Sequence, residues 1–265
     1  MIKLNGSPID IKKFPDGTLL MKQEFDRNTI QIIEWRFENN EELVALNFLN
    51  SHLRDKGAGY IKLQMWYIPN ARQDRTKKSE DVFTLKYFAK MINAMGFDKV
   101  CVLDPHSTVS EALFDNLVIA TPEFLIKDVY DRVSTLVGDD NTVMFYPDEG
   151  AMKRYSGLIA KPYAFGIKER DWTTGQIRGL SVFGEDIIKG KNILIMDDIC
   201  SRGGTFYHSA KKLKELGAEK IFLFVSHCEN TILDGDVLDS GLIERIYTTN
   251  SLFTAEHELI EVIDI

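Results

Sequence analysis

The chain has 265 residues, a length that suits two α/β domains of ~130 residues each or one large domain. Its formal net charge of −8 at pH 7 argues against a nucleic-acid-binding surface, which normally requires a basic stripe. The three cysteines, Cys101, Cys200 and Cys228, lie in or beside apolar runs, so we expect buried thiols rather than a disulfide or a metal site.

The amino-terminal half is expected to alternate strands and helices. Residues 1–23 predict a strand, a Phe-Pro-Asp-Gly turn and a second strand, because Pro-Asp-Gly is a strong turn sequence. We found no apolar signal segment at the start and no run of ~18 apolar residues, so we expect a cytoplasmic protein with no membrane segment. The periodicity predicts further strands at 30–35, 60–68, 99–103 and within 117–125, and helices at 40–56 and 82–95.

Two polar groups follow strands in this half. Arg72, Gln73 and Asp74 form a polar cluster after the strand at 60–68, which indicates either a solvated loop or a ligand site. Asp104 and His106 follow the strand at 99–103. The carboxyl end of a strand in an α/β sheet is a position suited to ligand binding.

The second half is expected to begin with a helix at 127–137. A strand at 142–146 leads to Asp148, and a strand at 163–167 leads to Lys168 and Arg170. Residues 171–190 are polar and carry Gly175, Gly179 and Gly184, so we expect this segment to include a mobile loop.

Residues 192–226 form the most informative stretch, a β-α-β unit. An apolar run at 193–196 ends in Asp197 and Asp198, a glycine pair follows, and a helix runs from Thr205 to a C-cap at Gly217 before the next apolar strand. In such a unit an anion lies against the N–H groups of the loop and the helix start. The two acids suit ribose hydroxyls or a hydrated Mg²⁺. The alternative is an ordinary βαβ turn with solvated acids.

Taken in order, these segments resemble the ribose-phosphate diphosphokinase family over nearly the whole chain. The matching motifs are FPDG at 14–17, ARQD at 71–74, D-x-H at 104–106, PD-x-G with KR at 147–154, KER at 168–170 and DD followed by GGT at 197–205. Phosphoribosyltransferases share only the last of these motifs.

The resemblance implies an α/β fold with two phosphoribosyltransferase-like domains, each a mainly parallel sheet flanked by helices, with the active site between them. We place the domains at 1–126, with the ATP motifs, and 127–265, with the ribose and phosphate loop. The implied reaction is attack of an anomeric ribose hydroxyl on the β-phosphorus of ATP, which releases AMP and leaves a diphosphate on the sugar. Mg²⁺ is the implied cofactor, with ATP as co-substrate.

The resemblance also assigns site residues. Lys168, Arg170 and His106 are expected to be catalytic, and His106 and Asp148 to organise Mg²⁺. ATP binding is expected from Phe14, Asp16, Arg72, Gln73, Asp74 and His106. Acceptor binding is expected from Asp148, Asp197, Asp198, Ser201, Arg202, Gly203, Gly204 and Thr205. Cations on a closing loop together with Mg²⁺ are what diphosphoryl transfer requires.

The phosphate-binding motif departs from the family pattern at two positions. The family usually has Asp-Thr where this chain has Ser201-Arg202, so an acid is absent and a guanidinium is added. Either Arg202 points into solvent, or the acceptor carries a larger anionic group than one phosphate at its 5-position. Members resembling this family diphosphorylate ADP-ribose in NAD metabolism. The acceptor is therefore ribose 5-phosphate or ADP-ribose.

The expected partners are ATP and a ribose 5-phosphate-type small molecule, with no nucleic acid and no membrane. Because the resemblance places Phe14 against the adenine of a neighbouring subunit, a homo-oligomer, at least a dimer, is expected. Ends shorter than those usual in the family suggest a smaller oligomer with weaker control by phosphate and ADP. Two other functions stay open: a non-catalytic regulatory partner of a synthetase, and a phosphoribosyltransferase.

Overall fold

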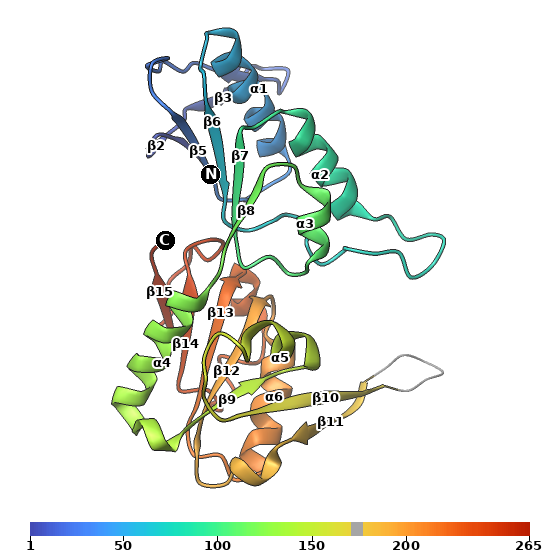
Figure 1. The fold of residues 1–265 in the computed structure, drawn as a ribbon, viewed down its shortest axis with the longest axis vertical. Helices are drawn as coiled ribbons and strands as arrows, with labels where there is room; N and C mark the ends of the chain where they lie inside the picture. The colour runs from blue at the N-terminus through green and yellow to red at the C-terminus, as the bar shows by residue number, and fades with distance from the viewer. Residues whose placement is uncertain (171–176) are drawn as a thin grey trace. The chain divides into compact units, whose positions relative to one another are not determined.

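The computed structural model describes residues 1–170 and 177–265, which form two compact units, Met1–Thr121 and Pro122–Ile265 (Figure 1). Each unit is built on a mainly parallel sheet flanked by helices, which confirms the expected fold class. The units divide between Thr121 and Pro122, earlier than the boundary expected after residue 126, because helix α4 (Glu123–Val137) begins directly after Pro122.

The amino-terminal unit contains a six-stranded sheet in the order β2-β1-β5-β6-β7-β8. The strands β5 to β8 are parallel, and β1 and β2 extend one edge in the antiparallel sense. The bounds are β1 (Ile2–Leu4), β2 (Ser7–Pro8), β5 (Gln31–Trp35), β6 (Ile61–Met65), β7 (Lys99–Leu103), β8 (Leu117–Ala120), α1 (Glu41–Asp55), α2 (Thr84–Ala94) and α3 (Val109–Leu113). A separate hairpin joins β3 (Ile11–Lys13) to β4 (Leu19–Met21).

The carboxy-terminal unit contains a seven-stranded sheet in the order β11-β10-β9-β12-β13-β14-β15. All neighbouring strands are parallel except β11, which pairs with β10 in the antiparallel sense. The bounds are β9 (Thr142–Tyr146), β10 (Tyr163–Arg170), β11 (Ile177–Phe183), β12 (Asn192–Cys200), β13 (Ile221–Cys228), β14 (Arg245–Thr249) and β15 (Ile260–Ile263). The helices are α4, α5 (Glu149–Tyr155) and α6 (Gly204–Glu215), with single turns η1 (Asp139–Asn141), η2 (Glu185–Ile187) and η3 (Asn230–Asp234).

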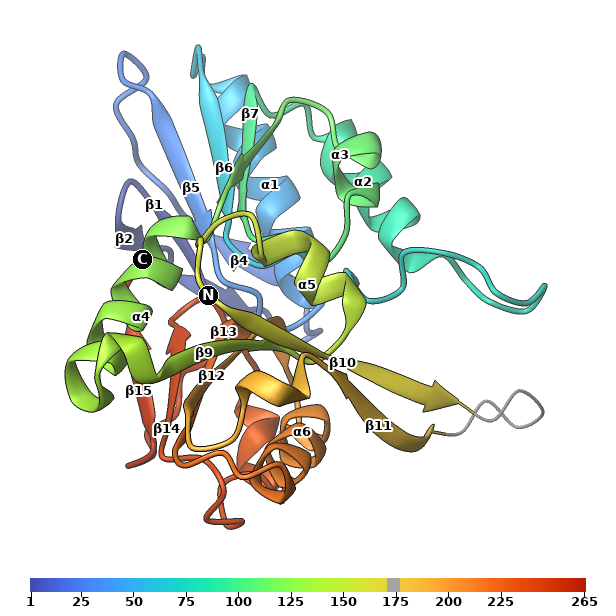
Figure 2. The ribbon, with the colours of Figure 1, turned by 60° about the horizontal axis from the view of Figure 1, so that its bottom comes forward.

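Helices cover both faces of this second sheet, which explains why its central strands contain continuous apolar runs. Ile193 and Ile195 of β12 share a core with Phe206 and Leu213 of α6. The alternate residues of β12 point to the other face, where α4 packs against β9, β12 and β13. Figure 2 shows α4 and α6 on opposite sides of the sheet. A strand buried on both faces needs a continuous apolar run.

Several sequence-based expectations need correction. Strand β11 and turn η2 lie within the segment 171–190 and were not predicted; the mobile loop expected in this segment stays a prediction, and residues 171–176 lie outside the described residues. Backbone pairing with β10 and contact of the Phe165 and Phe183 rings, 5.2 Å between centroids, outweigh the effect of Gly179 in β11. β14 and β15 were not predicted. All three thiols are free; Cys200 and Cys228 are buried, as expected, whereas Cys101 is only partly buried.

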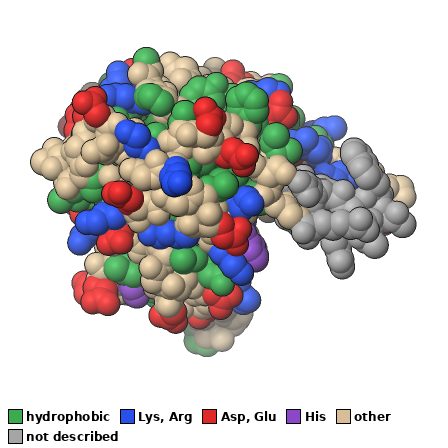
Figure 3. Space-filling model, turned by 90° about the horizontal axis from the view of Figure 1, so that it is seen from below, with side chains coloured by type: hydrophobic (Ala, Val, Ile, Leu, Met, Phe, Trp, Pro, Cys, Tyr) green, Lys and Arg blue, Asp and Glu red, His purple; other side chains and the backbone are tan. Residues whose placement is uncertain are grey.

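No helix in the described part of the chain is long and apolar enough to cross a membrane. On the face drawn in Figure 3, acidic and basic side chains are interspersed, and the coloured side chains form no continuous basic stripe. A nucleic-acid-binding surface would normally show one. The charge pattern of this face therefore agrees with the acidic composition.

Candidate active site

The carboxyl end of β12 carries two neighbouring carboxylates, Asp197 and Asp198. β12 stays paired with β13 as far as Cys200 and Cys228, so both acids lie within the strand and not directly after it. The side chain of Asp198 is 3% exposed and that of Asp197 is 15% exposed. The carboxyl edge of a parallel sheet is where α/β proteins bind ligands.

Arg154, in the last turn of α5, connects the two acids. Its Nη2 donates to Asp197 Oδ1 at 2.9 Å and to Asp198 Oδ1 at 2.8 Å. The guanidinium carbon also lies 5.1 Å from the centroid of the Tyr155 ring, within the range of a cation–π contact. A cation shared between two buried carboxylates reduces their repulsion and fixes their orientation.

Burial and mutual repulsion oppose the simultaneous ionisation of these two acids. Burial, followed by the charge of Asp198, raises the pKa of Asp197 well above its ordinary value; Arg154 opposes the rise and Asp148 adds to it. The pKa of Arg154 is raised as well, because Tyr155 and the two acids outweigh the opposing effect of burial, which is the largest single influence. The site therefore favours a cation or a proton between the acids.

Asp148 lies at the carboxyl end of β9, the strand beside β12. Its Oδ1 accepts a hydrogen bond from the Ala151 N–H at 3.1 Å, so it is the N-cap of α5. Its charge contributes to the raised pKa of Asp197. The structure thus brings three of the expected acceptor residues to one edge of the sheet.

Residues 201–205, called here the phosphate loop, connect β12 to α6. Gly203 has φ 76°, a left-handed conformation that favours glycine, and a Cβ there would lie 2.4 Å from Val237 Cγ1. Within the described chain no side chain caps the start of α6, and Gly204 and Thr205 are exposed. The N–H groups of the first helical turn can therefore bind an anion.

The two residues that depart from the family pattern have different surroundings. Ser201 Oγ donates to Glu229 Oε2 at 2.7 Å and lies 3.2 Å from Thr231 Oγ1. The side chain of Arg202 is exposed. The hydroxyl proton of Ser201 is therefore used by Glu229, while the Arg202 guanidinium stands at the surface beside the phosphate loop.

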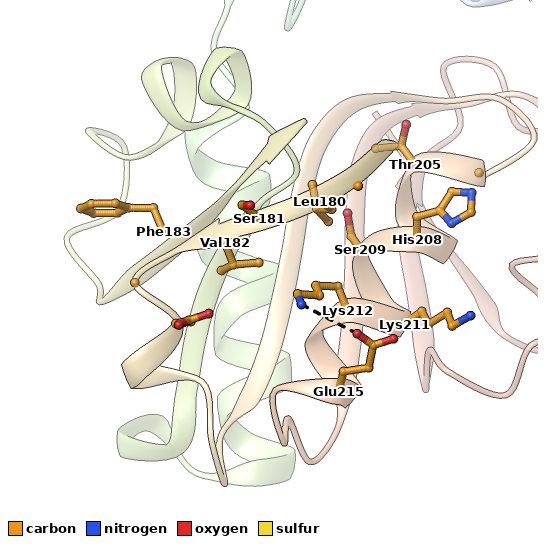
Figure 4. A pocket seen from close by; sticks show the side chains of 14 residues that line it. Leu180, Ser181, Val182, Phe183, Thr205, His208, Ser209, Lys211, Lys212 and Glu215 are labelled. Atoms are coloured by element: carbon orange, nitrogen blue, oxygen red, sulfur yellow. Dashed lines mark ion pairs between the residues drawn. The ribbon is translucent and has the colours of Figure 1, made fainter. Parts of the chain in front are cut away.

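A hollow of about 1160 Å³ opens beside the phosphate loop, between β11 and α6. Figure 4 shows Leu180 and Val182 on the β11 side, and Thr205 and His208 on α6. Further along the helix, Lys212 and Glu215 form an ion pair of 3.8 Å. Because the hollow begins at the start of α6, it can hold the part of a ligand that extends beyond a bound phosphate.

In the amino-terminal unit, the expected turn at 14–17 is confirmed. The Gly17 N–H donates to the Phe14 carbonyl at 2.9 Å, and Gly17 has φ 85°. The Phe14 ring is 48% exposed at this turn. The side-chain and backbone hydrogen bonds from Thr18, at 2.7 and 3.0 Å, lower the pKa of Asp16. The turn therefore presents an aromatic ring beside an ionised carboxylate.

The structure brings the polar cluster after β6 close to His106. The buried Asp74 accepts two hydrogen bonds from Arg75, 2.8 and 2.9 Å long. These bonds lower the pKa of Asp74 despite its burial, and Ser107 and His106 contribute in the same direction. Asp74 is therefore held in place by its neighbour Arg75. The neighbouring Arg72 and Gln73 are exposed, and Gln73 accepts a hydrogen bond from Thr84 Oγ1 at 2.8 Å.

Strain marks the end of β7 in the same unit. Asp104 is buried and has φ 41°, a left-handed conformation that is uncommon for a residue other than glycine. Backbone strain of this kind clusters at binding sites, where the surrounding structure holds it in place. This observation supports the interpretation of the D-x-H segment as part of a ligand site.

Lys168 and Arg170 lie on the last part of β10, and their backbones are paired with those of Leu180 and Ile177 on β11. The mobile loop was expected within 171–190, and residues 171–176 of that segment lie outside the described residues. The hairpin thus places both cationic residues at the far end of β10, where the chain leaves the sheet.

The sequence-based prediction missed the residues that support the phosphate loop from behind. Glu229 and Thr231 hold Ser201, and Gly235 lies so close to the loop that a Cβ there would be 1.9 Å from the Arg202 carbonyl oxygen. One of these had a usable signal: Glu229 is an acid that directly follows a buried strand. The clamping role of Arg154 was also missed, although its motif was noted.

The acids of this edge fit a hydrated Mg²⁺ bound together with a substrate. Among the described residues there is no group of three or more His, Cys, Asp or Glu side chains that could hold a metal ion by itself. Mg²⁺ usually retains several waters and binds through one or two carboxylates plus substrate phosphates. Asp148 and Asp197 are carboxylates of the required kind, whereas His106 belongs to the other unit.

Comparisons with known proteins show what this chain is similar to. Residues 1–96 match the family model for the N-terminal domain of ribose phosphate pyrophosphokinase. Ribose-phosphate pyrophosphokinase 1 of Streptococcus agalactiae is 30% identical over 237 residues, which cover 85% of this chain and 70% of that protein. The ribose-phosphate pyrophosphokinase of Pyrococcus furiosus is 27% identical over 247 residues, which cover 90% and 81%.

The crystal structure of phosphoribosylpyrophosphate synthetase from Mycobacterium smegmatis has the same fold. It matches with a TM-score of 0.79 at 20% sequence identity and covers 97% of this chain and 86% of that one. The match therefore includes both phosphoribosyltransferase-like units. With a relative at 30% identity over most of both chains, this chain belongs to the ribose-phosphate pyrophosphokinase family of transferases.

Proposed function

We propose that this protein transfers the β,γ-diphosphate of ATP to the anomeric hydroxyl of a ribose 5-phosphate-type acceptor and releases AMP. The observation that carries the proposal is the edge of the carboxy-terminal sheet. There a pair of acids clamped by Arg154 lies beside a glycine loop at an uncapped helix start. Carboxylates suit ribose hydroxyls and the helix start suits a phosphate. Family membership supplies the reaction class.

The transfer makes one bond and breaks another. The anomeric oxygen of the acceptor forms a bond to the β-phosphorus, and the bond from that phosphorus to the α,β-bridging oxygen breaks. The bridging oxygen leaves with AMP, and the proton of the anomeric hydroxyl passes to solvent or a nearby base. Such a transfer depends mainly on in-line positioning and on neutralising negative charge, and it needs no covalent intermediate.

The acceptor is proposed to lie along β12 and the phosphate loop. Asp197 and Asp198 would accept hydrogen bonds from the ribose hydroxyls. The N–H groups around Gly203, Gly204 and Thr205 would hold the 5-phosphate. Ser201 would act through loop conformation, because its proton is donated to Glu229.

ATP is proposed to bind to the polar cluster of the amino-terminal unit. The exposed Arg72 and Gln73 would contact the nucleotide, while the buried Asp74 would maintain the cluster through Arg75. The exposed Phe14 ring would stack on adenine in a neighbouring subunit, with Asp16 beside it. This assignment requires at least a dimer, so a fully active monomer would contradict it.

Lys168 and Arg170 are proposed to neutralise charge on the transferring group. Loss of such a cation is expected to lower turnover about 10³-fold or more, by analogy with other phosphoryl-transfer cations. Asp148 is proposed to hold the Mg²⁺ that accompanies ATP, with His106 contributing from the nucleotide side. When bound, the ion would offset part of the negative charge of the phosphates.

Two features keep ADP-ribose as a second candidate acceptor. The exposed Arg202 adds a cation beside the phosphate loop. The hollow between β11 and α6, lined by Leu180, Val182 and His208, begins at the same helix start and offers space beyond one phosphate. A diphosphate and a nucleoside would need that additional charge and space.

The proposal is tested by incubating the purified protein with Mg²⁺, ATP and either ribose 5-phosphate or ADP-ribose, followed by mass spectrometry. A diphosphate adduct and AMP with ribose 5-phosphate alone identify that acceptor and make Arg202 incidental. An adduct with ADP-ribose alone makes the altered phosphate loop the specificity determinant. If neither acceptor yields AMP, the proposal is wrong, and a non-catalytic partner or a phosphoribosyltransferase remains.

A further inference from the structure

The segment that follows β13 contacts the phosphate loop through Glu229, Thr231 and Gly235. The Glu229 N–H donates to the Cys200 carbonyl at 2.8 Å. Glu229 Oε2 accepts from Ser201 Oγ at 2.7 Å and from Thr231 Oγ1 at 3.0 Å. Beyond it, Gly235 lies against the Arg202 carbonyl. The conformation of the phosphate loop is therefore tied to residues about 30 positions later in the chain.

These bonds determine what Ser201 can do. A hydroxyl has one proton to donate, and Ser201 donates it to a carboxylate, which is a stronger acceptor than a neutral oxygen. A fully ionised phosphate can only accept hydrogen bonds. It therefore cannot accept one from the Ser201 hydroxyl while that hydroxyl donates to Glu229. Ser201 thus contributes to phosphate binding through the direction of its backbone and not through its side chain.

Glu229 also supplies a carboxylate at a position where the loop itself has none. Cys200 and Cys228 are register partners on neighbouring parallel strands, so the next residues, Ser201 and Glu229, emerge at the same level of the sheet. The acid that the family pattern has at position 201 is replaced by serine, and a carboxylate oxygen lies 2.7 Å from the serine hydroxyl. The negative charge is kept at this edge but comes from the adjacent strand.

We propose that Glu229 is a positioning residue of the acceptor site: it holds the phosphate loop through Ser201 and provides the carboxylate that position 201 lacks. This inference rests on the proposed acceptor site. Glu229→Gln retains the shape and an accepting oxygen but loses the charge, and Glu229→Ala removes both. In Ser201→Asp/Glu229→Ala, the acid returns to position 201. Glu256→Gln, an exposed glutamate of the same unit, is the matched control.

The experiment measures KM for ribose 5-phosphate, KM for ATP and kcat for each variant, together with calorimetric binding of ribose 5-phosphate and thermal unfolding. Loss of charge assistance in the bond to Ser201 is expected to raise KM and Kd for ribose 5-phosphate about tenfold in Glu229→Gln. The KM for ATP should stay within about twofold. Glu229→Ala should lose more, and the double variant should recover most of that loss.

The inference is overturned if Glu229→Gln binds ribose 5-phosphate as tightly as the control variant. Equal loss for ATP and ribose 5-phosphate together with a lowered Tm would mean that Glu229 is merely structural. A double variant no better than Glu229→Ala would refute the replacement of the acid. Calorimetry tests the role of Glu229 separately from the proposed reaction. If the unmodified protein binds ribose 5-phosphate without turnover, the proposed function is contradicted, but the binding data for the variants still test Glu229.

Discussion

Replacing Gly235 by alanine tests whether the phosphate loop depends on its support. Gly235 has φ −110° and ψ 161°, values that alanine adopts readily, so the substitution brings no backbone strain. The added Cβ, however, would lie 1.9 Å from the Arg202 carbonyl oxygen and 2.8 Å from its carbon. Carbon–oxygen contacts normally begin near 3.3 Å. One of the two segments must therefore move by about 1.4 Å, the difference of these values.

A displacement of this size at the phosphate loop has a large expected effect. Misplacing a substrate-positioning group by ~1 Å lowers catalysis by about 10²-fold, so kcat/KM for the acceptor should fall by about two orders of magnitude in Gly235→Ala. Overpacking is also expected to reduce the free energy of unfolding by ~1–3 kcal/mol. The KM for ATP should change little, because the proposed nucleotide contacts lie in the other unit.

The assay follows AMP release at varied ribose 5-phosphate, with a urea denaturation curve for each variant. Gly157→Ala is the control, because a Cβ at Gly157 meets no atom within 4 Å. A folded Gly235→Ala variant whose kcat/KM for the acceptor lies within about twofold of the unmodified protein would refute the reasoning. An equal loss in Gly157→Ala would refute it as well.

Three further predictions concern charges. Arg154→Ala leaves the two acids of β12 without the cation that they share. We expect urea denaturation to show a loss of ~3–5 kcal/mol in the free energy of unfolding, and kinetics to show a higher KM for the acceptor. Unchanged values of both would contradict this role of Arg154. Asp148→Asn keeps the helix cap, so Tm should hold while the Mg²⁺ concentration for half-maximal activity rises; an unchanged Mg²⁺ titration would remove Asp148 from the metal site. The pKa of Asp74 is lowered mainly by its bond to Arg75, so its stabilising contribution is present above the unfolded pKa of about 3.9 and lost as pH falls through the lower folded pKa. The urea midpoint of unfolding should therefore fall less between about pH 6 and about pH 3 in Asp74→Asn than in the unmodified protein. An equal fall in both proteins would exclude this contribution.

The fold was largely predictable because its central strands are short apolar runs with sharp ends. The strands expected at 99–103 and 142–146 coincide with β7 and β9. β12 was expected to end before its acids, yet it continues to Cys200 because β13 offers backbone partners that far. A local pattern reports which side chains are apolar, whereas the length of a strand depends on its partner. The same reason explains why β14 and the edge strand β15 were missed.

The candidate site was predictable where its residues follow a strand directly and unpredictable where distant segments meet. Arg154 lies 43 positions before Asp197, so the clamp could be found only after β9 and β12 were known to be neighbours. Gly235 gives no local signal at all, because its φ is ordinary and its need for glycine comes from the Arg202 carbonyl. Glu229 differs from both. An acid directly after a buried strand, next in the chain to the strand that carries Asp197, reaches the same sheet edge in a parallel arrangement. Applying that rule to every strand, and not only to the one with a known motif, would have placed Glu229 among the candidates from the sequence.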